Sequence, residues 1–250
     1  MTMLMALLQI DLPQDPRTNV MMLLRFLHFA GGITWIGLLY FFNLINVPFM
    51  KGLEAPTRSR IYSPLMSRAL WWFRWGSVVT VLAGFIYWAM IVAADARNAS
   101  ASGGHAMMTF FLIWTVAFVI EMGILMSPSD ALRKPVVLGI IVAVVVCAAA
   151  WLFVSLNSHG WESNRMLSIG VGGGMGWFMM LNVWGVIWRM QKRIIGWNEQ
   201  NAANGTPIPP ESAKLARLAF LASRVNFGLS FPMLFFMGAA SHYTLFGNIG

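Results

Sequence analysis

Six long apolar runs, joined by shorter polar segments, are the feature that most limits what this chain can fold into. The runs lie at about 20–47, 76–95, 106–126, 135–156, 166–189 and 215–246. A helix of about 20 apolar residues crosses the hydrocarbon core of a bilayer. Only 10% of the 250 residues are charged, compared with about 25% in soluble domains. We therefore predict an all-α polytopic membrane helix bundle, with about six transmembrane helices in a single integral membrane domain over 1–250.

The basic residues alternate between the two sides of this predicted bundle. Most of them lie in the connections 48–75, 127–134 and 190–214, and the opposite-side segments carry only Arg17, Arg97 and Arg165. Cytoplasmic loops are enriched in Lys and Arg, so the pattern predicts that both termini are periplasmic. The same pattern accounts for the net charge of +8. We therefore expect membrane lipid around the chain and no nucleic-acid partner.

The connections and the N-terminus carry weaker signals. The segment "SRALWWFRWG" (67–76) mixes Trp with Arg, which is typical of an interfacial anchor in a loop. "NEQNAANGTPIPP" (198–210) is rich in turn formers and predicts a polar hairpin. Residues 1–10 are apolar but too short to span, so we expect an interfacial segment and no signal peptide. Cys147 is the only cysteine, which excludes a disulfide within the chain and a CxxCH haem attachment.

The four histidines all fall on the predicted periplasmic side. His28 lies in the first apolar run and His242 near the end of the last one, at a similar predicted depth. Ionisable residues inside spanning helices are functional candidates by default. His105 and His159 lie at the edge of a run and in a loop, where solvation is the simpler interpretation.

The neighbours of these two histidines predict a cofactor. Arg25, Gly32 and Trp35 share a helix face with His28. A b-type haem needs axial imidazoles, small residues beside the ring, aromatic neighbours and cations for its propionates. We therefore predict haem b with His28 and His242 as iron ligands and Arg25 near a propionate. Room for the ring would come from glycines, and its lining from aromatic residues: Gly31, Gly32, Gly173 in "GVGGGMG" (170–176), Gly238, Trp35 and Phe235.

Other interpretations of the same residues stay open. The glycines are also typical of tight helix–helix packing, and the histidines could hold a bare metal ion or serve structural hydrogen bonds. His105, His159 or a methionine could replace one haem ligand. A second polar group, Glu121 and Arg224, is expected at one depth near the cytoplasmic side, together with Asn43 and Asn226. The simplest prediction for the two charges is a structural ion pair.

Three blocks of the sequence resemble a known family. "LHFAGGITWIGLLYFFN", "ALWWFRWGSVVTVLAG" and "NFGLSFPMLFFMGAASHY" are similar to the membrane domain of the bacterial membrane-bound urate oxidases, or urate hydroxylases. The first block also resembles membrane-type protoporphyrinogen oxidases and copper-resistance membrane proteins, which share a His-x6-Trp helix. The resemblance implies a protein of the bacterial inner (cytoplasmic) membrane that passes electrons to a cytochrome c on the periplasmic side. The family histidines near the first and last blocks fall on His28 and His242.

The chain also departs from that family. We expect a short form that lacks the C-terminal cytochrome c and a large outer insertion of the family. Further family histidines stand where this chain has Trp71, Ser168 and Val225. The expected function is a membrane redox protein that uses a separate periplasmic cytochrome c, with urate chemistry put in doubt by the missing histidines. The alternative is a non-catalytic subunit of a larger respiratory complex, because no nucleophile or acid–base constellation is visible.

Overall fold

The computed structural model describes residues 13–246, and every regular element in this range is helical. The elements in chain order are α2 (Pro16–Tyr40), the π-helix η1 (Phe41–Asn46), α3 (Val47–Gly52), α4 (Ala55–Asn98), α5 (Gly104–Met126), α6 (Pro135–Leu156), α7 (Asn164–Asn182), the π-helix η2 (Val183–Ile187), α8 (Trp188–Asn204) and α9 (Glu211–His242). Continuous stretches of these helices form six segments that are long and apolar enough to cross a membrane. The predicted all-α, multi-pass membrane bundle is therefore confirmed.

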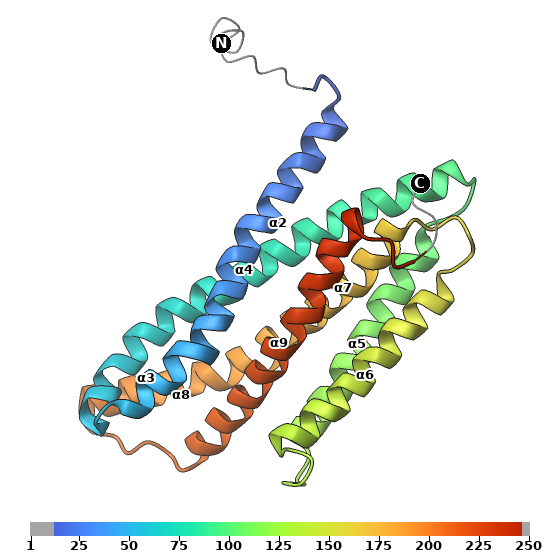
Figure 1. Cartoon of the computed structure of the whole chain (residues 1–250). Helices are drawn as coiled ribbons and strands as arrows, with labels where there is room; N and C mark the ends of the chain where they lie inside the picture. Colours follow the sequence, from blue (N-terminus) through green and yellow to red (C-terminus); the bar gives the residue numbers. More distant parts are fainter. Residues whose placement is uncertain (1–12, 247–250) are drawn as a thin grey trace, which may run out of the picture.

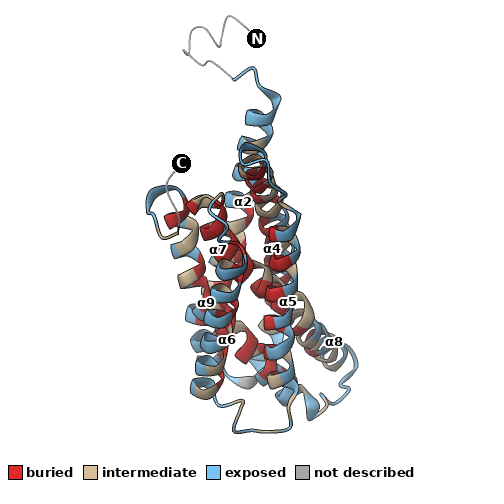
Figure 2. Cartoon of the chain, turned by 90° about the vertical axis from the view of Figure 1, so that its right-hand side faces the viewer, coloured by how far each residue is buried: buried red, intermediate tan, exposed pale blue. Residues whose placement is uncertain are grey.

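The bundle is built from antiparallel neighbours (Figure 1). α2 packs mainly along α4, α5 lies beside α6, and α7 packs along α9 while also contacting α4 and α5. Buried residues gather on the faces that the helices turn toward one another, and the outer faces are exposed (Figure 2). α7 is the central helix, and most of its residues are buried.

Both ends of the described chain lie at the same end of the bundle, here called the terminal end (Figure 1). An even number of crossings, here six, returns the chain to the side on which it started. The opposite end of the bundle is called the far end. The assignment of the terminal end to the periplasm remains a prediction. The expected interfacial segment at residues 1–10 lies outside the described residues.

Local sequence signals explain where several helices begin and end. Asp15 precedes α2, and its carboxylate accepts hydrogen bonds from the backbone N–H groups of Arg17 and Thr18 at 3.1 and 3.0 Å. Pro16 follows at the first helical position, where its missing N–H costs nothing. α8 ends at Gly205, whose φ of +75° places it in the left-handed region that favours glycine.

The predicted loop 48–75 is largely helical, which corrects the sequence interpretation. α4 has 44 residues and is therefore about 66 Å long, roughly twice the thickness of the hydrocarbon core. The Trp-rich segment 67–76 belongs to this helix, with Trp71, Trp72 and Trp75 exposed on its surface. The helix continues here with one face buried, including Leu70 and Phe73, and with these three indoles on the other face.

The other boundary corrections concern α8 and α9. The predicted polar hairpin at 198–210 is helical as far as Asn204, because α8 extends the fifth spanning segment. α4 and α8 support each other there: the Tyr62 hydroxyl donates to Gln191 Oε1 at 2.6 Å. The last helix runs from Glu211 to His242 instead of 215–246, so His242 is its final residue.

The buried polar group near the far end differs from the predicted ion pair. Glu121 is fully buried and accepts from Asn182 Nδ2 at 3.2 Å. The same amide donates to Asn226 Oδ1 at 3.0 Å, which links α5, α7 and α9. Arg224 lies against the ring of Phe220 instead of Glu121. The predicted Glu121–Arg224 pair is therefore wrong, because the carboxyl group is engaged by the Asn182 amide on α7 and the Arg224 guanidinium lies elsewhere.

Candidate functional site

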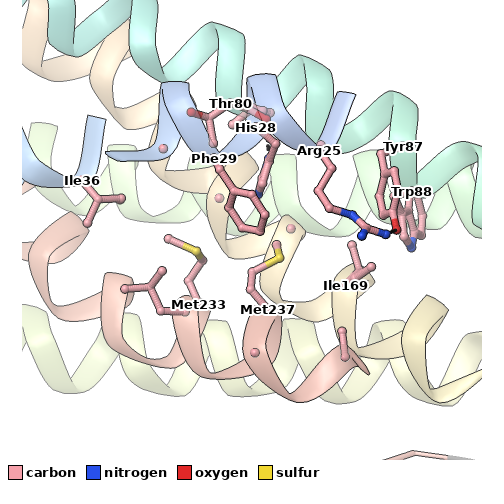
Figure 3. Close-up of a pocket in the computed structure, with 18 of the residues that line it drawn as sticks. Arg25, His28, Phe29, Ile36, Thr80, Tyr87, Trp88, Ile169, Met233 and Met237 are labelled. Atoms are coloured by element: carbon pink, nitrogen blue, oxygen red, sulfur yellow. Dashed lines mark hydrogen bonds between the residues drawn. The ribbon is translucent and has the colours of Figure 1, made fainter. Parts of the chain in front are cut away.

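A cavity of about 810 Å³ lies between α2, α4, α7 and α9 toward the terminal end. Its walls are mostly apolar, with polar groups from two histidines, two arginines, Tyr87, Thr80 and Ser241. Figure 3 shows α2 and α9 facing each other across the space, with α4 and α7 behind it. Ligand sites typically occupy about 300–1,000 Å³ and combine apolar walls with a few convergent polar groups. The cavity therefore has the size and character of a ligand site.

His28 is held in one orientation on the α2 side of the cavity. Its Nδ1 lies 2.8 Å from the backbone carbonyl oxygen of Thr80. A carbonyl oxygen can only accept, so Nδ1 carries the hydrogen, and in the neutral ring Nε2 keeps a free lone pair. Gly84 makes this contact possible, because a Cβ there would lie only 2.5 Å from Nδ1. An imidazole fixed by a backbone carbonyl is the usual arrangement of a metal-ligating histidine.

Two arginines meet at the terminal end of the cavity. Arg25 donates to the Tyr87 hydroxyl oxygen at 2.6 Å, and Arg165 donates to the same oxygen. Each guanidinium carbon lies 5.3 Å from the centroid of the Tyr87 ring. Positive charge is therefore concentrated around one buried phenol, and Figure 3 shows Arg25 reaching Tyr87.

α9 contributes two methionines and one histidine to the opposite wall. In Figure 3 the thioethers of Met233 and Met237 point from α9 across the cavity toward α2. His242 lines the cavity and is exposed. Asn164 at the start of α7 donates to the carbonyl oxygens of Ala240 and Tyr243 at 3.4 and 3.2 Å. His242 is therefore level with the arginines.

The two predicted haem ligands consequently differ in depth. His28 follows Arg25 by three residues, which is about 4.5 Å further from the terminal end. Met237 precedes His242 by five residues, which is about 7.5 Å in the same direction. The thioether of Met237 thus lies closer to the level of His28 than the His242 ring does.

The glycines of α7 serve both packing and the cavity. An added Cβ at Gly170 or Gly174 would collide with the rings of Phe153 and Trp114, so these positions admit neighbouring aromatic residues. Gly173 borders the cavity instead, with only ordinary contacts around an added Cβ, the nearest at 3.7 Å to Met237 Cε. The two interpretations of the glycine-rich segment therefore apply to different faces of one helix.

The cavity brings together all seven residues that the sequence predicts for the cofactor site: Arg25, His28, Gly32, Trp35, Gly173, Gly238 and His242. Their roles as ligands or contacts remain a prediction. Two other expected neighbours are placed elsewhere. Phe235 is 57% exposed on α9 and does not line the cavity. Gly31 allows α2 to approach α4, because an added Cβ would lie 2.7 Å from Thr80 Oγ1.

His105 and His159 form a separate pair at the terminal end. Their ring centroids are 6.0 Å apart, and neither lines the cavity. His159 Nδ1 lies 2.7 Å from Glu162 Oε1. Within residues 13–246, no three His, Cys, Asp or Glu side chains gather as a site for a metal ion. A bare metal ion would therefore find no cluster of three such side chains among the described residues.

The sequence prediction missed Tyr87, Arg165, Thr80 and Met237 as lining residues. Arg165 carried one usable signal, because it is a rare cation on the predicted periplasmic side. It also stands in the first turn of α7, where cations oppose the helix dipole. Tyr87 and Met237 lie in apolar helix sequence and carry no signal that separates them from packing residues.

The fold and the cavity define a class of protein: a polytopic α-helical membrane protein with a polar-lined cavity between its spanning helices. The chain belongs to the family of urate oxidase N-terminal domains, whose model matches residues 51–248. The matched range includes Tyr87, Arg165 and His242 but begins after Arg25 and His28. Comparison with curated proteins and with solved structures found no match. The chain is therefore a urate oxidase-related membrane domain.

Proposed function

We propose that this membrane domain is a redox protein that holds a b-type haem in the cavity and exchanges electrons with a periplasmic cytochrome c. The observation that carries the proposal is the orientation of His28. Its Nδ1 is engaged by the Thr80 carbonyl oxygen at 2.8 Å, which leaves Nε2 free on a residue that lines the cavity. Bound haem would supply one-electron redox chemistry.

The other residues around the cavity are compatible with this group. Gly32, Gly173 and Gly238 leave space along three helices, with no atom closer than 3.7 Å to an added Cβ. Trp35 also lines the cavity, and its indole N–H has no hydrogen-bond partner in the described part of the chain. The volume of about 810 Å³ lies within the range for cofactor sites.

In the proposal that follows from the sequence, His242 would be the second residue to hold the haem iron. Met237 is the alternative, because its thioether points from α9 toward α2 (Figure 3). Both are known types of haem ligand. The near-infrared bands of the ferric protein separate imidazole–imidazole from imidazole–thioether ligation, so His242→Ala and Met237→Leu decide between them.

A reduced-minus-oxidised spectrum of the purified protein tests the proposal. We expect the α-band of a b-type haem in protein from cells well supplied with haem. The band should be lost in His28→Ala and kept in His159→Ala, whose histidine lies outside the cavity. A colourless wild-type protein that takes up no added haem would refute the haem proposal.

The competing function is a non-catalytic subunit of a respiratory complex. The exposed indoles of Trp71, Trp72 and Trp75 on α4 favour it, because contiguous exposed aromatic surface is a common docking feature. Purification from native membranes separates the two functions. Urate-dependent reduction of cytochrome c by the isolated domain would favour an enzyme, and a stable large complex without such activity would favour the subunit.

A further inference from the structure

The two arginines at the terminal end of the cavity have no carboxylate partner in the described part of the chain. None of the ion pairs formed between residues 13 and 246 includes Arg25 or Arg165. Instead, both guanidinium groups donate to the hydroxyl oxygen of Tyr87. Cations within spanning helices normally pair with an opposite charge. An unbalanced pair of like charges on one phenol therefore requires an explanation.

The nearby acidic residues are engaged elsewhere. Asp95 accepts from the hydroxyl and backbone N–H of Ser163 at 2.6 and 3.3 Å. Glu162 accepts from the backbone N–H of His159 at 2.8 Å and contacts its ring. Neither carboxylate lines the cavity. Neither of these two acids, among the residues that the structure describes, therefore balances the positive charge at this end.

Several donors in the cluster remain free for a ligand. A guanidinium carries five N–H groups in a planar fork, and each arginine uses one nitrogen on Tyr87. Arg165 Nε is buried and has no partner among the described residues. Because the Tyr87 oxygen accepts from both arginines, its own hydrogen is also available to donate. This arrangement fits a planar anion with two oxygen atoms.

We propose that Arg25, Arg165 and Tyr87 bind one carboxylate group at the terminal end of the cavity. Charge-assisted bonds from a guanidinium fork to a carboxylate are strong and geometrically specific. The start of α7 adds the positive end of a helix dipole, and its first turn carries no acidic residue. The carboxylate is either a haem propionate, an assignment that rests on the proposed function, or the acid group of a separate small molecule.

The first experiment compares haemin with its dimethyl ester, which lacks both carboxylates. Purified protein in a maltoside detergent, which carries no phosphate, is titrated with each compound. Wild-type protein should bind haemin about 10-fold to 100-fold more tightly, because the ester cannot form the charge-assisted bonds. Arg165→Gln and Arg25→Gln should lose most of this preference. Arg224→Gln is the matched control, because Arg224 is half-buried, lies against Phe220 and does not line the cavity.

The second experiment tests a separate carboxylic acid as the source. Haem-free protein is titrated with hexanoate and with the neutral analogue hexanamide, and the melting temperature is followed. Stabilisation by hexanoate alone, lost in Arg165→Gln and kept in Arg224→Gln, would support a free acid as ligand. This result in a protein that takes up no haem would leave the carboxylate site standing while the haem proposal fails.

The inference is overturned by one combination of results. Wild-type protein would bind haemin and its ester equally, or bind neither, and hexanoate would stabilise it no more than hexanamide does. All of these measurements use wild-type protein, so the test does not depend on whether an arginine variant folds.

Discussion

Gly84→Ala should detach His28 from its anchor without changing either member of the hydrogen bond. The added Cβ would lie 2.5 Å from His28 Nδ1 and 2.8 Å from Cε1. Ordinary contact begins at 3.4 Å, so the ring must move by about 0.9 Å. The bond from Nδ1 to the Thr80 carbonyl oxygen, now 2.8 Å long, cannot survive that displacement.

Two magnitudes follow for this variant. Overpacking and the lost hydrogen bond should lower the free energy of unfolding by about 1–3 kcal/mol. Loss of the partner that orients a metal-ligating histidine typically lowers metal affinity about 10–100-fold. We therefore expect Gly84→Ala to bind haem at least about 10-fold more weakly than wild type and to show a broadened or shifted α-band.

The assay is an optical titration of haem-free protein with haemin, combined with thermal unfolding in detergent. Gly139→Ala on α6 is the matched control, because no atom lies within 4 Å of the added Cβ. This control should keep the affinity of wild type and should not lower its melting temperature, because alanine favours a helix at least as much as glycine does. A Gly84→Ala protein with wild-type haem affinity and an unchanged spectrum would refute the role assigned to the Thr80–His28 bond.

Three further predictions concern the polar network, the first helix and the topology. Asn182→Ala should lower the free energy of unfolding by about 2–3 kcal/mol, because the buried Glu121 loses the amide that donates to it; Asn198→Ala, which removes a half-buried amide bonded only to the Ile194 carbonyl oxygen of its own helix, should lower it less in the same denaturation assay. The hydrogen bonds from Thr18 and Arg17 hold the pKa of the Asp15 carboxyl below its usual range. Its contribution to the start of α2 is therefore full above the ordinary pKa and lost as the pH falls through the lowered value, which amide exchange near Thr18 should detect; unchanged exchange across that range would contradict it. Alkaline phosphatase fused to the C-terminus should be active and green fluorescent protein dark, and the opposite result would reverse the predicted topology.

Hydropathy predicted the spanning helices because lipid offers no hydrogen-bond partners to the backbone. Each apolar run must therefore form its backbone hydrogen bonds within its own helix. The α6 prediction, 135–156, matches the structure, because Pro135 begins that apolar run and Asn157 follows it. Prediction failed at 55–75 and in α8, where the chain leaves the predicted spans but stays helical. Outside the hydrocarbon core, charged and aromatic residues no longer mark the end of a helix, so composition cannot separate an extended helix from a loop.

The candidate site was predictable where its residues share one helix face. The spacing on α2 linked Arg25, His28, Gly32 and Trp35, and all four line the cavity. The partners from other helices depend on register, which local sequence does not specify. Arg165 meets Tyr87 because α4 and α7 are aligned by the bond from Trp88 Nε1 to the Met166 carbonyl oxygen at 2.9 Å.

The cavity itself results from an asymmetry that a glycine-rich sequence does not reveal. On one side of α7, Phe153 and Trp114 fill the space that Gly170 and Gly174 leave, so the helix packs closely against α5 and α6. On the other side, Gly173 borders the cavity with only ordinary contacts around an added Cβ, the nearest at 3.7 Å to Met237 Cε, and the rings of Phe29 and Tyr40 on α2 line the space without closing it. Identical residues thus produce dense packing on one face and open space on the other. The difference lies in which neighbours carry large side chains at the same depth, and this open face is where His28 and the arginines project.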